Sequence, residues 1–423
     1  MIRSSLILMG ALLTLPSPGI GQEVPDSTTR AETPAPEPDT TRWIAVAPRP
    51  RSTVVAVTVV FPAGAAQDAA GRGGTAWMLA QTLQSMATDA LGPLASARVT
   101  ADRGRFRATL LATPSDWSSA VSTLATVLFR RDLRDDRFEE GRSRLLGRMA
   151  FEAGAPVREF EVEAARVYAA GEADWARPPD GDLEGLPALT VGDLQQYRRL
   201  HLLPEQAVVA VVGPVDEADA IRTAAGLFPG RRSAARASNR SAAWVTGDRL
   251  VLPRDITNAS LAFAYPLPPG GSRTDAEFLA HVLEGKLNSD PPDPGVYRIQ
   301  TRVEEAPAGP LLVVEAAVFP DVGVRWERQI AGAVREVALT EADEDVYFPW
   351  QQRRFRSHAM GRDAAPEERA RRLAQDLLRA GTIRDLDADL SALTVRSLIA
   401  TAQALGEPRI LLFGPNLEAD RDR

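Results

Sequence analysis

Apolar residues along the chain follow two different spacings, which together predict strands and helices. Residues 54–62 form a nearly continuous apolar run that is typical of a buried strand. After a glycine turn at residues 71–74, apolar side chains recur three and four positions apart, as on one face of a helix. Longer helical patterns occupy residues 135–152 and 366–378. Because hairpins connect several of these segments, we expect an α+β fold with helices on a mainly antiparallel sheet.

The same order of segments occurs twice. The apolar run that ends at Phe61 has a counterpart that ends at Tyr265, and each of these residues is followed by proline. A later apolar run that ends in Gly-Pro at Gly213 has a counterpart that ends in Gly-Pro at Gly414. Both pairs are about 200 residues apart, a spacing that indicates an internal duplication.

The duplication predicts two α/β sandwich domains, each a mainly antiparallel sheet packed by helices. In each half a hairpin should follow the first helix, with its turn at residues 102–104 or 306–310. The predicted boundaries are a signal peptide at 1–21, a disordered linker at 22–42, a first domain at 43–230, a connector at 231–245 and a second domain at 246–421.

The N-terminus has the pattern of a secretory signal peptide. One early arginine precedes an apolar run at residues 6–15, and small residues lead to a predicted cleavage just after Gly21. The run is too short to span a bilayer. Residues 22–42 are rich in proline, threonine and acids, so they cannot offset their ordering entropy by burial. We therefore expect an exported protein, periplasmic or secreted.

Composition excludes several classes of function. The chain has no cysteine, which rules out disulfides, thiolate metal sites and a cysteine nucleophile. Its net charge of −7 argues against nucleic acid as a partner. No second long apolar run follows the N-terminus, so no membrane span is expected. Phosphate-loop, dinucleotide and Ser/His/Asp signatures are also missing from the sequence.

The segment GTAWMLAQ, at the start of the predicted helix, resembles a known zinc motif. In the insulinase/pitrilysin metallopeptidases, or inverzincins, the first helix carries G-x-A-H-x-L-E-H, whose histidines bind zinc and whose glutamate activates water. The frame positions Gly74, Ala76 and Leu79 match, whereas the functional positions hold Trp77, Ala80 and Gln81. The resemblance implies a fold of the mitochondrial-processing-peptidase type. We expect Trp77 to be partly buried where the zinc would lie.

The remaining ligand positions agree with a lost zinc site. The resemblance places the third ligand near Leu146 or Gly147, and the acids Glu139 and Glu140 come a turn or more too early. His281 begins a half motif with a glutamate three residues later, but we interpret it as a core or solvated histidine. Zinc needs at least three good ligands, so we expect no metal or other cofactor.

A tyrosine in the second half is the strongest candidate for a catalytic role. In exported bacterial heterodimers of this family, the resemblance implies that the zinc-lacking subunit contributes Arg and Tyr from a segment R-G-x-x-Y-x-V. Here Tyr297 aligns with the tyrosine, but Asp293 occupies the arginine's place. Arg298 and Arg302 are candidates for substrate binding. The alternative for Tyr297 is a strand residue packed at a sheet edge.

These observations favour a catalytically inactive insulinase-family subunit that binds peptide substrate and pairs with a zinc-bearing paralogue. The alternative is a structural or assembly scaffold of the same fold with no peptidase role, as the family's core subunits of respiratory complexes suggest. A third possibility, an active hydrolase with unrelated chemistry, has no supporting residues in the sequence.

Overall fold

The computed structural model places residues 39–423 in one compact unit. It describes residues 40–229, 247–288, 295–341, 347–415 and 417. The predicted signal peptide, most of the predicted linker, the predicted connector and Asp293 lie outside the described residues. Among the helices that the structure describes, none combines the length and apolar character needed to cross a membrane.

The first sheet has five strands in the order β1-β5-β2-β4-β3. Strands β1 and β5 are parallel, and the other neighbours are antiparallel. The strands are β1 (Ile44–Pro48), β2 (Val55–Phe61), β3 (Ala95–Ala101), β4 (Phe106–Ala112) and β5 (Val208–Gly213).

The second sheet repeats this topology in the order β6-β10-β7-β9-β8, again with one parallel pair, β6 and β10. Its strands are β6 (Arg249–Pro253), β7 (Ala259–Pro266), β8 (Val296–Ala306), β9 (Gly309–Val318) and β10 (Arg409–Gly414). Because β7 occupies the position of β2, and β10 that of β5, the predicted duplication is confirmed. The α+β fold class, with two mainly antiparallel sheets packed by helices, is confirmed as well.

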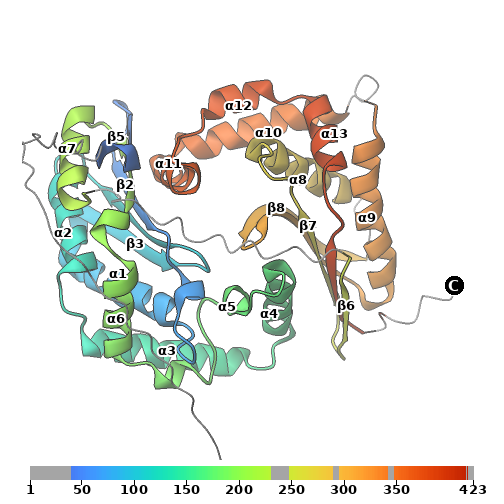
Figure 1. Cartoon of the computed structure of the whole chain (residues 1–423), viewed down its shortest axis with the longest axis horizontal. Coiled ribbons are helices and arrows are strands. Elements are labelled where there is room, and N and C mark those ends of the chain that lie inside the picture. The colour runs from blue at the N-terminus through green and yellow to red at the C-terminus, as the bar shows by residue number, and fades with distance from the viewer. Residues whose placement is uncertain (1–39, 230–246, 289–294, 342–346, 416, 418–423) are drawn as a thin grey trace, which may run out of the picture. The chain divides into compact units, whose positions relative to one another are not determined.

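Helices accompany both sheets (Figure 1). Those that follow the strands of the first half are α1 (Thr75–Leu91), α2 (Trp117–Phe129), α3 (Asp135–Glu152), α4 (Pro156–Ala169), α5 (Ala173–Ala176), α6 (Val191–His201) and α7 (Glu217–Leu227). Those of the second half are α8 (Arg273–Leu287), α9 (Gly323–Leu339), α10 (Tyr347–Ala364), α11 (Pro366–Ala380), α12 (Leu386–Ala392) and α13 (Val395–Gln403).

Both faces of each sheet are apolar. Every residue of β2 is buried, and successive side chains of a strand point to opposite faces. Val57 and Val59 enter the core formed with α1, α2 and α3, while Ala56 and Val60 enter a separate cluster on the other face. Each sheet therefore needs helical cover on two sides.

The second face of each sheet is covered by a helix from the opposite half. Leu373 and Leu377 of α11 pack with β2 and β5 of the first sheet, and α11 lies beside these strands in Figure 1. In the same way, Val167 and Tyr168 of α4 pack with β7, β9 and β10 of the second sheet. This exchange of helices joins the two halves through apolar burial.

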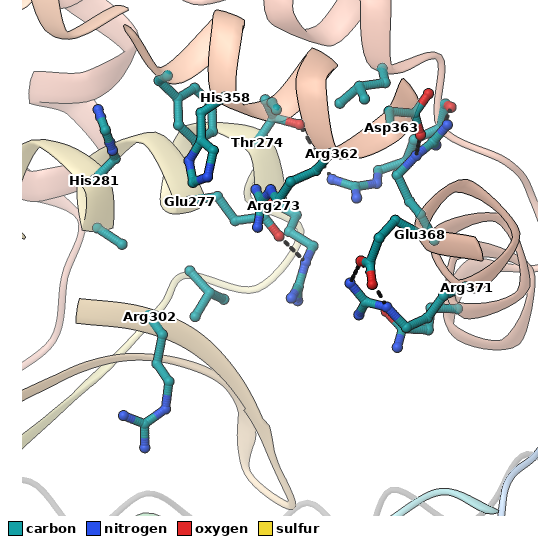
Figure 2. Close-up of a pocket in the computed structure, with 18 of the residues that line it drawn as sticks. Arg273, Thr274, Glu277, His281, Arg302, His358, Arg362, Asp363, Glu368 and Arg371 are labelled. Atoms are coloured by element: carbon teal, nitrogen blue, oxygen red, sulfur yellow. Dashed lines mark hydrogen bonds and ion pairs between the residues drawn. The ribbon is translucent and has the colours of Figure 1, made fainter. Parts of the chain in front are cut away.

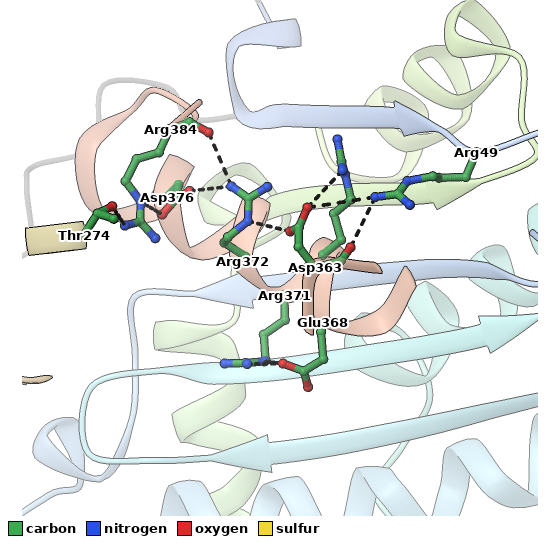
Figure 3. Close-up of polar contacts among 9 residues, drawn as sticks. Arg49, Thr274, Asp363, Glu368, Arg371, Arg372, Asp376 and Arg384 are labelled. Carbon is green, nitrogen blue, oxygen red and sulfur yellow. Dashed lines mark hydrogen bonds and ion pairs between the residues drawn. The ribbon is translucent and has the colours of Figure 1, made fainter. Parts of the chain in front are cut away.

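A chain of ion pairs surrounds α11 (Figure 3). Asp376 is 2% exposed and accepts hydrogen bonds from Arg372 at 3.2 Å and from Arg384 at 2.9 Å. Arg372 also donates to Asp363 at 2.7 Å, and Arg49, after β1, lies 3.9 Å from the same carboxylate. The two cationic partners of Asp376 offset its desolvation, and the contact of Arg49 with Asp363 links the network to the first half.

A buried carboxylate holds the entry to α1. Asp68 accepts hydrogen bonds from the backbone N–H groups of Gly74 at 2.8 Å and Ala76 at 2.9 Å, where the helix leaves its first donors unpaired. Gly74 has φ of 89°, and a Cβ there would lie 2.8 Å from the carbonyl oxygen of Asp180. Burial raises the pKa of Asp68 to about 7, against the lowering effect of these backbone N–H groups and of Arg177.

We predict that Leu377→Ala lowers the free energy of unfolding of the whole compact unit. The change removes cover from the first sheet although the residue belongs to the second half, and such buried truncations cost about 2–5 kcal/mol. Leu339→Ala is the matched control, because Leu339 is 81% exposed. Calorimetry should show a single transition that shifts as a whole; two transitions, with only one affected, would contradict the exchange of cover.

We predict that Asp68 makes stability fall as pH rises from about 4 to 7. In this interval the folded carboxyl, with its raised pKa, holds a proton that the unfolded chain has released, so folding binds protons and loses up to about 1.4 kcal/mol per pH unit. Asp68→Asn lacks this contribution. The stability of the variant relative to the wild type should therefore increase with pH in denaturant titrations, and a constant difference would contradict the prediction.

Candidate functional site

The three changed positions of the zinc motif lie on α1, which packs against the first sheet. Trp77 is partly buried, which agrees with the expectation from sequence, Ala80 is fully buried, and Gln81 is partly exposed. None of the three side chains has the ligand chemistry of an imidazole or a carboxylate. The glutamate that activates water in the family would therefore have its place taken here by a methyl group inside the core.

A guanidinium covers the tryptophan. The Arg148 side chain extends from α3, and its guanidinium carbon lies 5.4 Å from the centre of a Trp77 ring. Arg148 donates to Asp180 at 2.8 Å, and Arg158 of α4 donates to the other oxygen of the same carboxylate at 2.6 Å. The place of the zinc site is thus occupied by a cation–π contact and an ion-paired cluster.

The expected third-ligand segment also has no ligand function. Leu146 packs against the core of the first half, and a Cβ at Gly147 would meet open space. Glu139 forms a surface ion pair with Arg142, and Glu140 pairs with neighbouring arginines of α3. Across the described residues, no group of three or more His, Asp or Glu side chains is arranged to hold a metal ion.

Sequence reasoning missed Asp68, Asp180 and the two arginines that bind Asp180. Asp68 and Asp180 are both buried, and they meet around the glycine turn only because the chain returns there. The only local signal was the Pro-Pro-Asp-Gly sequence that ends at Gly181, which predicts a turn and gives no partner.

Tyr297 lies at the start of β8, next to a register shift between Val296 and Arg298. Its side chain is 61% exposed, and its ring centre is 4.8 Å from that of Phe319. Within the part of the chain that the structure describes, its hydroxyl forms no hydrogen bond, so it is free to donate to a ligand. Arg298, the next residue, is exposed as well, and its charge acts on Glu315.

Arg302, the other candidate for substrate binding, is engaged within the fold. Its two terminal nitrogens donate to the two oxygens of Glu315 at 2.8 and 2.7 Å. Tyr168 of α4 donates to the same carboxylate at 2.6 Å. Burial opposes the charge on Arg302, but the bonds to Glu315 prevail and raise its pKa. This geometry favours a role for Arg302 in holding α4 against the second sheet.

A cavity of about 390 Å³ lies beside α8 and α10 in the second half. Figure 2 shows His281 on α8 and His358 on α10, with Arg273 and Glu277 nearer the N-terminal end of α8. Burial lowers the pKa of His281, which favours a neutral imidazole. Glu284, the other member of the half motif, accepts a hydrogen bond from the backbone N–H of Thr301 at 3.1 Å. The pair is therefore part of the fold, as interpreted from the sequence.

Comparison with known proteins gives a family match over part of the chain. Residues 188–292 match the family model described as "Peptidase M16 inactive domain". No curated protein is significantly similar to the chain in sequence.

Solved structures share the fold at low sequence identity. A peptidase M16 inactive domain from Pseudomonas fluorescens is 14% identical, with a TM-score of 0.74 over 88% of this chain and 95% of its own. A protease from Helicobacter pylori is 13% identical, with a TM-score of 0.70 over 87% and 96%. A chain of Complex III2 from Candida albicans is 14% identical, with a TM-score of 0.68 over 88% and 93%. The chain is thus similar in fold to solved structures that include an M16 inactive domain, residues 188–292 match an M16 family model, and the zinc-motif positions hold Trp77, Ala80 and Gln81.

Proposed function

We propose that the chain is a catalytically inactive subunit, exported to the periplasm or secreted, that binds peptide and completes or supports a zinc-bearing partner of the same family. The observation that carries the proposal is the filled zinc site. Trp77, with Arg148 over its ring, occupies the position where the family holds its metal, while the surrounding fold is kept.

Tyr297 supports the part of the proposal that concerns catalysis in the partner. An exposed phenol with an unused hydroxyl can donate to the oxyanion that develops at a scissile carbonyl. Phe319 supports its ring from one side, which limits the conformations that the side chain samples. Arg298, the next residue in the chain, is exposed, and its guanidinium can hold a peptide carbonyl or carboxylate.

The second candidate function is an assembly scaffold without a peptide substrate. It is favoured by the fold shared with a chain of Complex III2 and by Arg302, which is bound to Glu315. The two functions differ in one respect that can be measured, because only the first requires a change in turnover when Tyr297 is altered.

We predict that the isolated chain purifies without stoichiometric zinc and that restoring the motif does not create a tight site. Trp77→His, Ala80→Glu and Gln81→His together bury a carboxylate at a fully buried position and remove the ring beneath Arg148. The triple variant should lose several kcal/mol of stability. Gln81→His alone, at a partly exposed position, is the control. One tightly held zinc per chain, found by elemental analysis in the wild-type protein or in the triple variant, would contradict the prediction.

We predict that Tyr297→Phe lowers kcat of the reconstituted pair by about 10²–10³-fold while assembly and peptide affinity stay nearly unchanged. The lost hydroxyl would stabilise the transition state more than the bound substrate. Tyr265→Phe is the matched control, because the buried hydroxyl of Tyr265 has no hydrogen-bond partner among the described residues. Equal kcat values for wild type and Tyr297→Phe would exclude the catalytic contribution and favour the scaffold.

A further inference from the structure

A cavity of about 1000 Å³ is lined by the turns of the two equivalent hairpins, β3–β4 and β8–β9, and by α11. Arginines from three parts of the fold converge on it. They are Arg103, Arg105 and Arg107 of the β3–β4 hairpin, Arg273 of α8, and Arg371 and Arg379 of α11. The carboxylates in the lining are Asp102, Glu172, Asp174, Glu304 and Glu305.

Most of these carboxylates already bind backbone N–H groups, an arginine outside the cavity, or two arginines at once. One oxygen of Asp102 accepts the backbone N–H groups of Gly104 and Arg105 at 2.9 and 2.8 Å. A single oxygen of Glu305 serves both Arg273, at 2.5 Å, and Arg379, at 2.9 Å. Asp174 pairs with Arg177 and Glu304 with Arg302, neither of which lines this cavity.

The arginines of the β3–β4 hairpin are consequently short of partners. Within the described residues, the guanidinium of Arg105 forms no hydrogen bond or ion pair. The Nε atoms of Arg103 and Arg107 are buried without a hydrogen-bond partner, and the ion pair of Arg107 with Asp102 is 3.8 Å long. Buried donors of this kind cost free energy until an acceptor reaches them.

The like charges also act on one another. Burial, together with the charges of Arg273 and Arg105, lowers the pKa of Arg379 to about 10, against the raising effect of Glu305. The pKa of Arg107 is lowered by burial, with Arg371 and Arg105 adding to the effect and Asp102 opposing it. The arginines of the cavity therefore repel one another, and a bound anion would relieve this repulsion.

We propose that this cavity binds an acidic peptide segment, whose carboxylates accept hydrogen bonds from Arg105 and from the unused Nε–H groups of Arg103 and Arg107. Guanidinium groups pair with carboxylates in a planar, two-point geometry. The volume exceeds what a single small anion fills, and the lining offers apolar surface for the rest of a peptide at Trp175, Leu267, Pro268, Pro307 and Pro310. The inference rests on the proposed peptide-binding function and names the class of peptide.

The test uses the purified full chain and three fluorescent peptides of equal length. One alternates Asp and Glu with Gly, the second has Asn and Gln in their places, and the third has Lys. The acidic peptide should bind at least about tenfold more tightly than the neutral one, with an affinity that falls as salt is raised. Arg103→Gln combined with Arg105→Gln should weaken acidic binding by about 10–100-fold. Arg144→Gln is the matched control, because the Arg144 side chain is 71% exposed on α3.

A second measurement separates binding from folding. Arg105→Gln removes a charge that its neighbours repel, so it should raise the melting temperature of the empty chain while it weakens acidic binding. Equal binding of the acidic and neutral peptides, or equal binding by the double variant and the control, would overturn the inference. Binding of inorganic pyrophosphate without binding of the acidic peptide would also overturn the inference, in favour of a small-anion site. Tight binding of only the neutral peptide would overturn the preference for acidic peptides without contradicting the proposed function. The proposed function is tested separately, by the turnover of the reconstituted pair.

Discussion

The exchange of α4 and α11 between the halves is the constraint on which the rest of the structure depends. Each sheet is apolar on both faces, and its own helices cover only one. The other face is closed by a helix of the opposite half, so neither half has a complete hydrophobic cover alone. The Arg49–Asp363 ion pair and the Tyr168–Glu315 hydrogen bond then add a polar contact across each exchange. Polar contacts thus specify a geometry that apolar burial stabilises.

This arrangement also determines where charge accumulates. Because α11 must lie on the first sheet, its arginines face those of the β3–β4 hairpin, and the carboxylates near them are shared or bonded to the backbone. Around Trp77 the charges are instead paired locally, since Asp180 accepts hydrogen bonds from Arg148 and Arg158, and Glu152 and Glu161 lie 4.0 and 3.9 Å from these two guanidinium groups. The arginines near Trp77 are therefore already paired, whereas the arginines of the cavity have N–H groups available for a ligand.

The two regions suggest how a chain can keep a peptidase fold after losing its chemistry. A tryptophan and a guanidinium fill the metal locus, so the first helix retains its packing without a metal. The fold presents Tyr297 on its surface and keeps the arginine-lined cavity, the two features to which the proposals above assign contacts with a partner and a peptide.

Local patterns in the sequence determined the elements, the duplication and the loss of the zinc ligands. The bounds predicted for α3 agree with the structure, and those for α11 agree to within two residues, because proline, glycine and helical periodicity act over a few residues. The exchange of helices, the pairing of Arg148 with Trp77 and the binding of Arg302 by Glu315 were decided only by the tertiary structure. These contacts join residues far apart in the sequence, and a local pattern shows that a face is apolar or charged without showing which distant segment will meet it.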